Sequence, residues 1–313
     1  MRRSLAITPA LLFFCTAAFS ADSAPQYGVN LVQNGNFELG KGWQPVNWSR
    51  MDRLTSFWKE AVPGKRNIDP GSAEKAGGQF PSGRYLLIDT DVLLSQYQER
   101  QKELDNNPEA APPEKIPVKP PGYDSVGGTY GVAVRSDPIP IEQDAYYNIS
   151  AWCKGTWQKN ADGDFMPMIF VKGYSTHGPS GREQEVTRKY LACRADAEKG
   201  WQFFTWTRPY APGKLRKDVK VEYVRLVVFC YWPRYEYGFD DVRFFRVPEP
   251  PDSEKSPLEK DPEGKHGTAV TPDDDKDWLP PPAEKQPAKD QPDVKPEDYD
   301  ALKSLTEVTP SGE

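Results

Sequence analysis

Short runs in which apolar and polar residues alternate recur through the middle of the chain. In the clearest run, 146–154 (YYNISAWCK), Tyr147, Ile149, Ala151 and Cys153 share one face and Asn148, Ser150 and Trp152 share the other. A period of two residues is typical of a strand with one buried face. Similar runs, rich in β-branched and aromatic residues and bounded by Gly, Pro or Asp, lie at 84–88, 130–135, 166–172, 201–208, 221–229 and 237–246.

Because no long amphipathic helix separates these runs, they predict an all-β sandwich or barrel rather than a βαβ fold. The segment 21–247 has the length of one large domain of this class. One stretch, 91–126, interrupts the pattern. Its first part, 92–105, is charged and predicts a short helix, and its second part contains six prolines and must be extended. We predict a solvated insertion here.

The N-terminus has a separate character. Arg2 and Arg3 precede an uncharged apolar run at 5–19, and small residues stand at Ala18 and Ser20. This layout predicts a secretory signal peptide over 1–20, with the mature chain beginning near Ala21. The alternative is an uncleaved membrane anchor, but the run is short for a span. We therefore expect an exported protein with no membrane span after cleavage.

Proline and negative charge gather at the C-terminus. Residues 248–313 hold 13 Pro, 18 Asp or Glu and 8 Lys, a net charge of −10, whereas the whole chain carries −6. Such a segment has too little apolar surface to fold, so we predict a disordered acidic tail. The rest of the chain is then nearly neutral, which argues against nucleic acid as a partner, since nucleic acid requires a concentrated basic face.

Three motifs carry a family likeness. The mature chain opens with 30–38 (NLVQNGNFE), contains 147–155 (YNISAWCKG) and closes with 238–244 (GFDDVRF). Together they resemble the carbohydrate-binding modules with a galactose-binding-like jelly-roll fold, of the xylan- and glucan-binding kind. The resemblance spans about residues 28–247 apart from the insertion. It implies a β-sandwich jelly roll and a polysaccharide or glycan as the partner.

Acidic residues in the opening and closing motifs suggest a structural Ca²⁺. With Val242 and Phe244 facing the core, a period of two turns Asp240 inward as well, and a buried carboxylate needs a partner or a cation. In the family that the chain resembles, an opening Glu and a closing Asp hold Ca²⁺, and the resemblance places them at Glu38 and Asp240, beside Asp241. The alternative is that the two aspartates cap loops or pair with Arg.

Aromatic side chains in or beside loops are candidates for sugar binding. Aromatic rings stack on the apolar faces of pyranose rings, and polar neighbours bond the hydroxyl groups. The densest cluster is 231–237 (YWPRYEY). The alternative for each residue is a structural role in closing the ends of the sandwich. The candidates are Trp48, Trp58, Trp152, Trp157, Tyr174, Trp232, Tyr235 and Tyr237.

The sequence shows no catalytic motif. Its two histidines, His177 and His266, lie in a Gly/Ser/Pro loop and in the tail, and it contains no nucleophile elbow, zinc-ligand spacing or phosphate-binding glycine loop. Three cysteines remain after cleavage, Cys153, Cys193 and Cys230. The two in predicted strands, Cys153 and Cys230, are favoured as buried free thiols, with a disulfide as the alternative because export permits one.

We therefore expect an exported, non-enzymatic protein that binds a glycan in the periplasm or at the cell surface. Two other hypotheses stay open. One is a structural or protein-interaction module of the cell envelope that docks a partner through the tail or the insertion. The other is a glycoside hydrolase with an unrecognised pair of acids.

Overall fold

The structure is a computed structural model. The residues that it describes are 27–62, 66–77, 79–81, 83–117, 131–160, 163–176, 183–214, 220–231 and 236–251. The predicted signal peptide and the tail beyond residue 251 lie outside this set. No helix within the described ranges has the length and apolar character needed to cross a bilayer.

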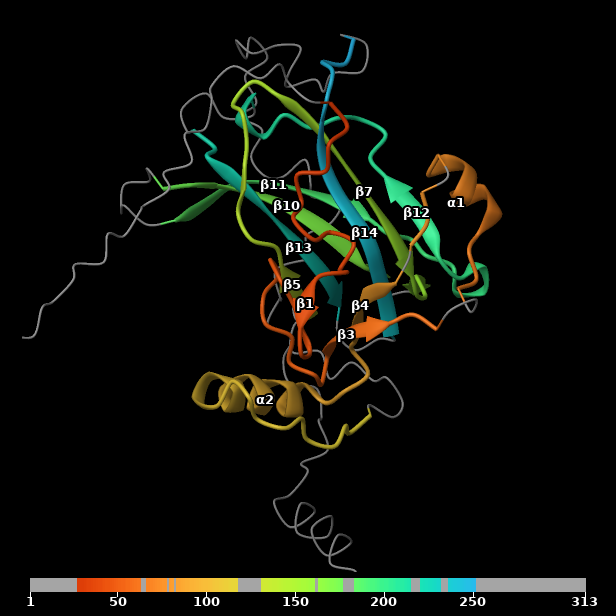
Figure 1. Ribbon diagram of the computed structural model, residues 1–313, viewed down its shortest axis with the longest axis vertical. Helices are drawn as coiled ribbons and strands as arrows, with labels where there is room; N and C mark the ends of the chain where they lie inside the picture. Colours follow the sequence, from red (N-terminus) through yellow and green to blue (C-terminus); the bar gives the residue numbers. More distant parts are fainter. Residues whose placement is uncertain are drawn as a thin grey trace, which may run out of the picture.

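The described strands form two five-stranded antiparallel sheets, which Figure 1 shows as the two main layers, and two short hairpins. The predicted all-β sandwich is therefore confirmed. One sheet has the order β11-β10-β13-β5, with β6 also paired to β13: β11 (Gln184–Ala192), β10 (Met168–Ser175), β13 (Tyr223–Tyr231), β5 (Gly131–Arg135) and β6 (Ile139–Pro140). The other has the order β12-β7-β14-β4-β3: β12 (Gln202–Thr205), β7 (Tyr146–Lys154), β14 (Glu236–Val247), β4 (Arg84–Asp89) and β3 (Ser56–Glu60). The hairpins pair β1 (Gly40–Lys41) with β2 (Gln44–Pro45), and β8 (Gln158–Asn160) with β9 (Gly163–Phe165).

The core lies between the two sheets and is built from alternate positions of each strand. On β7, the inward set of the sequence pattern, from Tyr147 to Cys153, belongs to the buried core. From the facing sheet come the alternate residues Val224, Leu226 and Val228 of β13. Each fully buried aliphatic side chain of this kind contributes about 1.5–3 kcal/mol of transfer free energy, so the alternation itself holds the layers together.

The three cysteines within the described ranges lie in this core as free thiols. The favoured interpretation of the sequence is therefore confirmed. Burial raises the pKa of Cys153, and hydrogen bonding to Cys193 adds to the effect. Burial likewise raises the pKa of Cys230. Cys153 and Cys230 therefore stay protonated and behave as small apolar side chains.

A third layer covers part of the outer face of the second sheet. Helix α1 (Pro70–Lys75) begins at Asp69, whose carboxylate accepts a hydrogen bond from the Ser72 amide at 2.8 Å, and Figure 1 shows α1 beside β12. The chain before it pairs with β12, since the Trp201 amide donates to the Asn67 carbonyl at 2.8 Å. Trp152 and Trp201 form a separate apolar cluster under this layer with Ala76.

The insertion is anchored to the rest of the domain over its described part, 91–117. Its first part forms α2 (Leu94–Asn106), as the charge pattern predicts. The buried Arg100 guanidinium donates to the carbonyls of Asp52 (2.9 Å), Ala110 (2.9 Å) and Ala111 (3.0 Å). Most of these residues are exposed to solvent, but Arg100 ties α2 to Asp52 and to the segment that follows the helix, an anchor that the sequence analysis does not predict. Residues 118–126 lie outside the described set.

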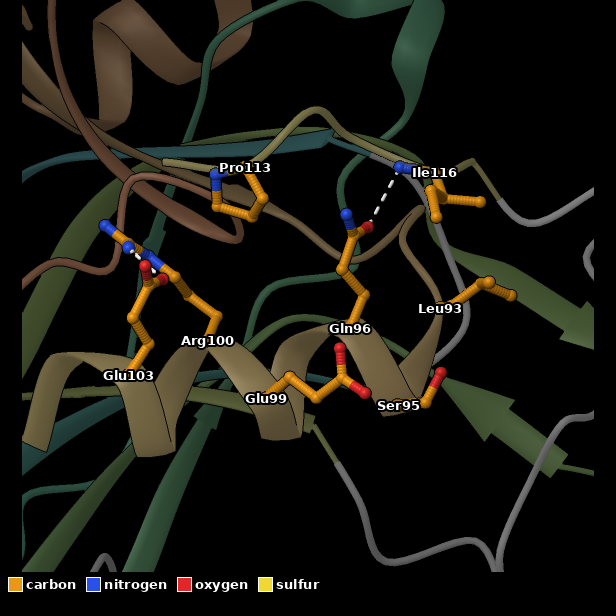
Figure 2. Close-up of a pocket in the computed structure, with 8 residues that line it drawn as sticks. All are labelled: Leu93, Ser95, Gln96, Glu99, Arg100, Glu103, Pro113 and Ile116. Atoms are coloured by element: carbon orange, nitrogen blue, oxygen red, sulfur yellow. Dashed lines mark hydrogen bonds and ion pairs between the residues drawn. The ribbon is translucent and has the colours of Figure 1, made fainter. Parts of the chain in front are cut away.

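A cleft of about 310 Å³ separates α2 from the extended segment that follows it (Figure 2). Gln96 reaches across from the helix, and its side-chain oxygen accepts a hydrogen bond from the Ile116 amide at 2.9 Å. Figure 2 also shows Glu103 turned toward Arg100, with which it forms an ion pair at 2.6 Å. The bond between Gln96 and Ile116 holds the extended part of the insertion against α2.

One irregularity in β14 changes a prediction. The register with β7 shifts between Asp240 and Arg243, and Asp241 has a left-handed φ of 44°. Such a bulge inserts an extra residue and reverses which side chains face the core. Asp240 therefore lies opposite Trp152 on the outer face, not on the core face of Val242, and the predicted inward orientation is wrong. Asp240 is nevertheless fully buried, under the layer that contains α1.

Candidate functional site

The outer face of the β11-β10-β13-β5 sheet carries an unusual number of aromatic side chains. An exposed face of an antiparallel sheet is ordinarily polar. Here the outward positions of β10, β11 and β13 hold half-buried rings that pack over two buried outward residues, Met168 and Val227. We call this surface the aromatic face, and its rings are Phe170, Tyr174, Tyr190, Tyr223, Phe229 and Tyr231.

The strand register groups these rings into two sets. Residues directly opposite each other on neighbouring strands share a face and contact. At one end of the sheet, Tyr174 of β10 lies opposite Tyr223 of β13, and their rings stack with centroids 5.4 Å apart and an interplanar angle of 15°. This pair forms a stacked aromatic group at that end of the face.

The second set lies further along the same strands. Phe170 lies opposite Tyr190, with ring centroids 6.0 Å apart, and contacts Phe229 at 5.8 Å. Phe229 in turn meets Tyr231 at 4.9 Å in an edge-to-face arrangement. Edge-to-face contacts fix the ring planes, so this group is a rigid apolar surface.

Charged side chains lie between the two ring groups. Lys172 of β10 forms an ion pair with Glu185 of β11 at 3.0 Å, and Arg188 contacts the same carboxylate at 2.5 Å. Burial raises the pKa of Glu185, but hydrogen bonds from Arg188 and Lys172 outweigh it and leave this pKa lowered. Arg225 pairs with Glu183 at 3.3 Å. The face thus combines flat rings with fixed hydrogen-bonding groups.

Three tyrosines of the aromatic face, Tyr174, Tyr223 and Tyr231, have raised pKa values. Burial, together with the carboxylate of Glu183, raises the pKa of Tyr223 to about 12. Burial raises the pKa of Tyr231 to about 12 as well, and that of Tyr174 above its usual value. Their hydroxyl groups therefore keep their protons and can both donate and accept hydrogen bonds.

Two of the predicted sugar-binding tryptophans are held by hydrogen bonds at the opening motif. The Trp48 indole N–H donates to the Asn34 carbonyl at 3.0 Å, and its ring contacts Phe37 at 4.8 Å within the core. The Trp58 N–H donates to the Phe37 carbonyl at 2.6 Å, and the Arg84 guanidinium lies 4.1 Å from the Trp58 ring centroid. Both fix the opening loop, and neither belongs to the aromatic face.

The remaining predicted candidates are dispersed. Trp152 and Tyr237 are buried, the first under the layer of α1 and the second in the core. Trp157 is half-buried beside Arg194, whose guanidinium carbon lies 5.8 Å from the ring centroid. Trp232 and Tyr235 lie outside the described residues. Of the candidates within the described residues, Tyr174 alone lies on the aromatic face.

The carboxylates predicted to hold Ca²⁺ are engaged by other partners. Asp240 forms an ion pair with Arg66 at 2.6 Å, with side chains 1% and 12% exposed respectively. Burial raises the pKa of Asp240 to about 7, although Arg66 acts against it. Asp241 pairs with Arg243 at 3.1 Å.

Glu38 has a similar structural role. Its carboxylate accepts a hydrogen bond from the Arg84 amide at 2.9 Å and lies against Gly83, where an added Cβ would stand 2.1 Å from Oε1. Arg66 also donates to the Gly83 carbonyl, at 3.2 Å. No three acidic, Cys or His side chains within the described ranges are grouped so as to hold a metal ion. This donor set does not fit Ca²⁺, which takes six to eight oxygens.

Four aromatic residues of the face, Phe170, Tyr190, Tyr223 and Phe229, have no place among the sequence candidates, whereas Tyr231 opens the densest predicted cluster. The signal was present in the strands: β13 alternates Tyr223, Arg225, Val227, Phe229 and Tyr231 on one side with aliphatic residues on the other. A strand with aromatic residues on one face and aliphatic residues on the other has two apolar faces. This is the signature of a surface that binds something or is covered.

No protein-family model matches the sequence, and comparison with curated proteins finds no match. Comparison with solved structures finds similar chains, carbohydrate-binding modules among them. A family 61 carbohydrate-binding module, TmCBM61, solved with β-1,4-galactotriose, is 11% identical with a TM-score of 0.35, covering 70% of this chain and 99% of the module. The C-terminal family 22 module of Clostridium thermocellum Xyn10B is 11% identical with a TM-score of 0.31, covering 72% of this chain and 98% of the module.

A phage enzyme is also similar. The enzymatically active domain of tailspike protein 4 from bacteriophage CBA120 is 10% identical with a TM-score of 0.36, and the match covers 70% of this chain. The match spans 21% of the length of that domain.

Proposed function

We propose that this chain is a non-catalytic, exported protein that binds a polysaccharide or other glycan on its aromatic face. The observation that carries the proposal is the pair of ring groups on the outer side of β10, β11 and β13. A pyranose ring has apolar C–H faces and an equatorial belt of hydroxyl groups. Flat rings beside fixed polar groups match both parts of that surface.

The Tyr174–Tyr223 pair supports the proposal most directly. Two stacked phenols offer apolar ring surface to a sugar, while their protonated hydroxyl groups remain able to bond sugar hydroxyls. The rings are already fixed by cross-strand packing. A ligand that stacks on them therefore costs little side-chain entropy.

The proposal includes export of the chain from the cytoplasm. The basic and apolar N-terminal run supports secretion into the periplasm, the cell surface or the extracellular space. The acidic, proline-rich tail has the composition of an extended spacer. We propose that either this tail or the insertion contacts an envelope protein.

The test is affinity electrophoresis of the full chain through gels that contain soluble polysaccharides. We expect at least one neutral or acidic polysaccharide to retard the protein. Tyr223→Ala should weaken the retardation about tenfold, because one aromatic contact contributes about 1 kcal/mol or slightly more.

The matched control is Tyr27→Ala. Tyr27 is 53% exposed and lies beside Arg246 of β14, in the other sheet. This control should leave retardation unchanged, and thermal melts of both variants verify folding. If no polysaccharide retards the chain while cross-linking in cells captures an envelope protein through the aromatic face, the protein-interaction hypothesis replaces this one.

A further inference from the structure

The aromatic face carries a row of three cations. Lys172 of β10 lies directly opposite Arg188 of β11 on one side and directly opposite Arg225 of β13 on the other. Like charges at directly opposed positions of a sheet destabilise it unless anions lie between them. A fourth cation, the exposed Arg135, extends the positive surface on β5.

The carboxylates of the face balance this charge in part. Glu185 is shared by Lys172 and Arg188, and Glu183 pairs with Arg225. Within the described strands β5, β10, β11 and β13, the outward positions thus hold four cations and one carboxylate, Glu185, with Glu183 just before β11. The excess is positive on a domain that is nearly neutral as a whole.

The cations are positioned by the rings themselves. The Arg188 guanidinium lies 5.8 Å from the centroid of Phe170, and the Lys172 ammonium lies 5.9 Å from it. The Arg225 guanidinium lies 5.6 Å from the centroid of Tyr223. Contact with a ring holds a guanidinium flat and leaves its edge free to bond a second anion.

The cationic row lies between the two ring groups. Lys172 is two residues from Phe170 and two from Tyr174, which places about 7 Å between the row and each ring group along the strand. A sugar stacked on either group therefore has cations beside its edge. The side chains of Lys172, Arg188 and Arg225 are 21%, 48% and 26% exposed, so they are accessible to a ligand.

We propose that the glycan bound by the aromatic face is anionic, with carboxylate or sulfate groups that the row of Arg188, Lys172 and Arg225 recognises. The proposal rests on the glycan-binding function proposed above and specifies its ligand class. A guanidinium group can donate two parallel N–H bonds to one carboxylate or sulfate group. A neutral sugar has no oxyanion to accept such a pair of bonds.

The experiment compares matched polymers by titration with the full chain. Polygalacturonate is compared with its carboxyl-reduced, neutral form, and dextran sulfate with dextran, so that each pair differs in charge alone and the two anions are tested separately. We expect at least one acidic polymer to bind about tenfold or more tightly than its neutral partner. That affinity should fall as salt rises from 50 to 500 mM, roughly a threefold contraction of the screening length.

Variants separate the cationic row from general charge. Lys172→Gln combined with Arg225→Gln should remove the preference for the acidic polymer. The matched control, Lys41→Gln combined with Lys59→Gln, removes the same charge from exposed positions of β1 and β3 and should retain the preference. Thermal melts report whether each variant is folded.

The outcomes are distinguishable. If neutral polymers bind as tightly as acidic ones, or if both double variants lose the acidic polymer equally, this inference is wrong while glycan binding stands. If neither acidic nor neutral polymers bind, the proposed function fails and the inference fails with it.

Discussion

Asp240 illustrates how one backbone residue decides which face a carboxylate occupies. Strict alternation from Val242 predicts that Asp240 points into the core, but the left-handed Asp241 adds a residue to the strand and reverses the face. The sequence shows the period and not the bulge, because nothing local distinguishes an Asp in a regular strand from one in the left-handed conformation. Asp240 therefore pairs with Arg66 outside the sandwich core.

The pKa of Asp240 gives the first prediction. Burial raises it to about 7, well above the usual value of 3.8, so folding favours the protonated acid. This stabilisation is complete below about pH 4 and is lost as the pH rises through 7. We expect the difference in free energy of unfolding between the wild type and Asp240→Asn to shrink from pH 4 to pH 8. Urea unfolding at a series of pH values measures it.

The opposite trend contradicts this expectation. If the wild type gains stability relative to Asp240→Asn as the pH rises, the ion pair with Arg66 at 2.6 Å outweighs burial, and Asp240 is ionised throughout.

Trp152 gives the second prediction, because its ring is buried and its neighbours are structural. It contacts Phe203 at 5.5 Å within the cluster under α1. Trp152→Phe should lower the free energy of unfolding by about 2 kcal/mol through the cavity left behind. Glycan affinity should not change. Weaker binding with unchanged stability would mean that Trp152 contacts the ligand.

At the scale of elements, alternation predicts the strands that contribute one face to the core and misses others. The period-two runs coincide with β4, β5, β7, β10, β12, β13 and β14 within a few residues. In β11 (QEVTRKYLA), charged residues obscure the pattern. It is an edge strand of its sheet, and edge strands carry charges of this kind. Helix α1 has six residues, too few to show a period.

Helix α2 is an element whose charge suggests solvent exposure, yet Arg100 is 1% exposed and Leu104 fully buried. The sequence cannot show this, because a charged residue is buried only when distant carbonyls are available to it, as those of Asp52 and Ala110 are here.

The third prediction follows from those carbonyl groups. Arg100→Met keeps the side-chain length but leaves three backbone carbonyls without their donor, which should cost about 1–3 kcal/mol each where they remain buried. We expect faster amide hydrogen exchange in 94–117, with exchange in β10 and β13 unchanged. Lys102→Met, at an exposed position of the same helix, is the control. Equal exchange in both variants contradicts the anchoring role of Arg100.

At the scale of the whole molecule, two apolar clusters lie on opposite sides of the second sheet, and Arg66 closes the smaller one. Its guanidinium carbon lies 4.9 Å from the Trp201 ring centroid and 5.5 Å from that of Tyr85, beside Asp240. The guanidinium thus brings to Asp240 the positive charge that a bound Ca²⁺ supplies when carboxylates hold it.

The fourth prediction concerns the metal. A chelator should leave the melting temperature of the full chain unchanged, whereas Arg66→Met should lower the free energy of unfolding by about 3 kcal/mol, because it leaves a buried carboxyl group without its partner. A fall in melting temperature with chelator that added Ca²⁺ reverses, and that Glu38→Gln abolishes, would establish calcium binding instead.

The sequence determines the fold class more fully than it determines the candidate site. Alternation and the opening and closing motifs predict the sandwich, but the candidate site depends on which strands are neighbours. Tyr174 and Tyr223 are far apart in sequence and meet through the register of β10 with β13. That pairing is a property of the whole sheet, which is why the loop aromatics were the visible candidates and the strand aromatics were not.

The most direct test of glycan binding by the aromatic face is the dissociation constant of the full chain for a polysaccharide that retards it, measured by titration calorimetry. The account predicts that Tyr174→Ala combined with Tyr223→Ala weakens binding by about a hundredfold, if each ring contributes about 1.4 kcal/mol, while Tyr27→Ala leaves it unchanged. Equal affinity of the wild type and the folded double variant would contradict it.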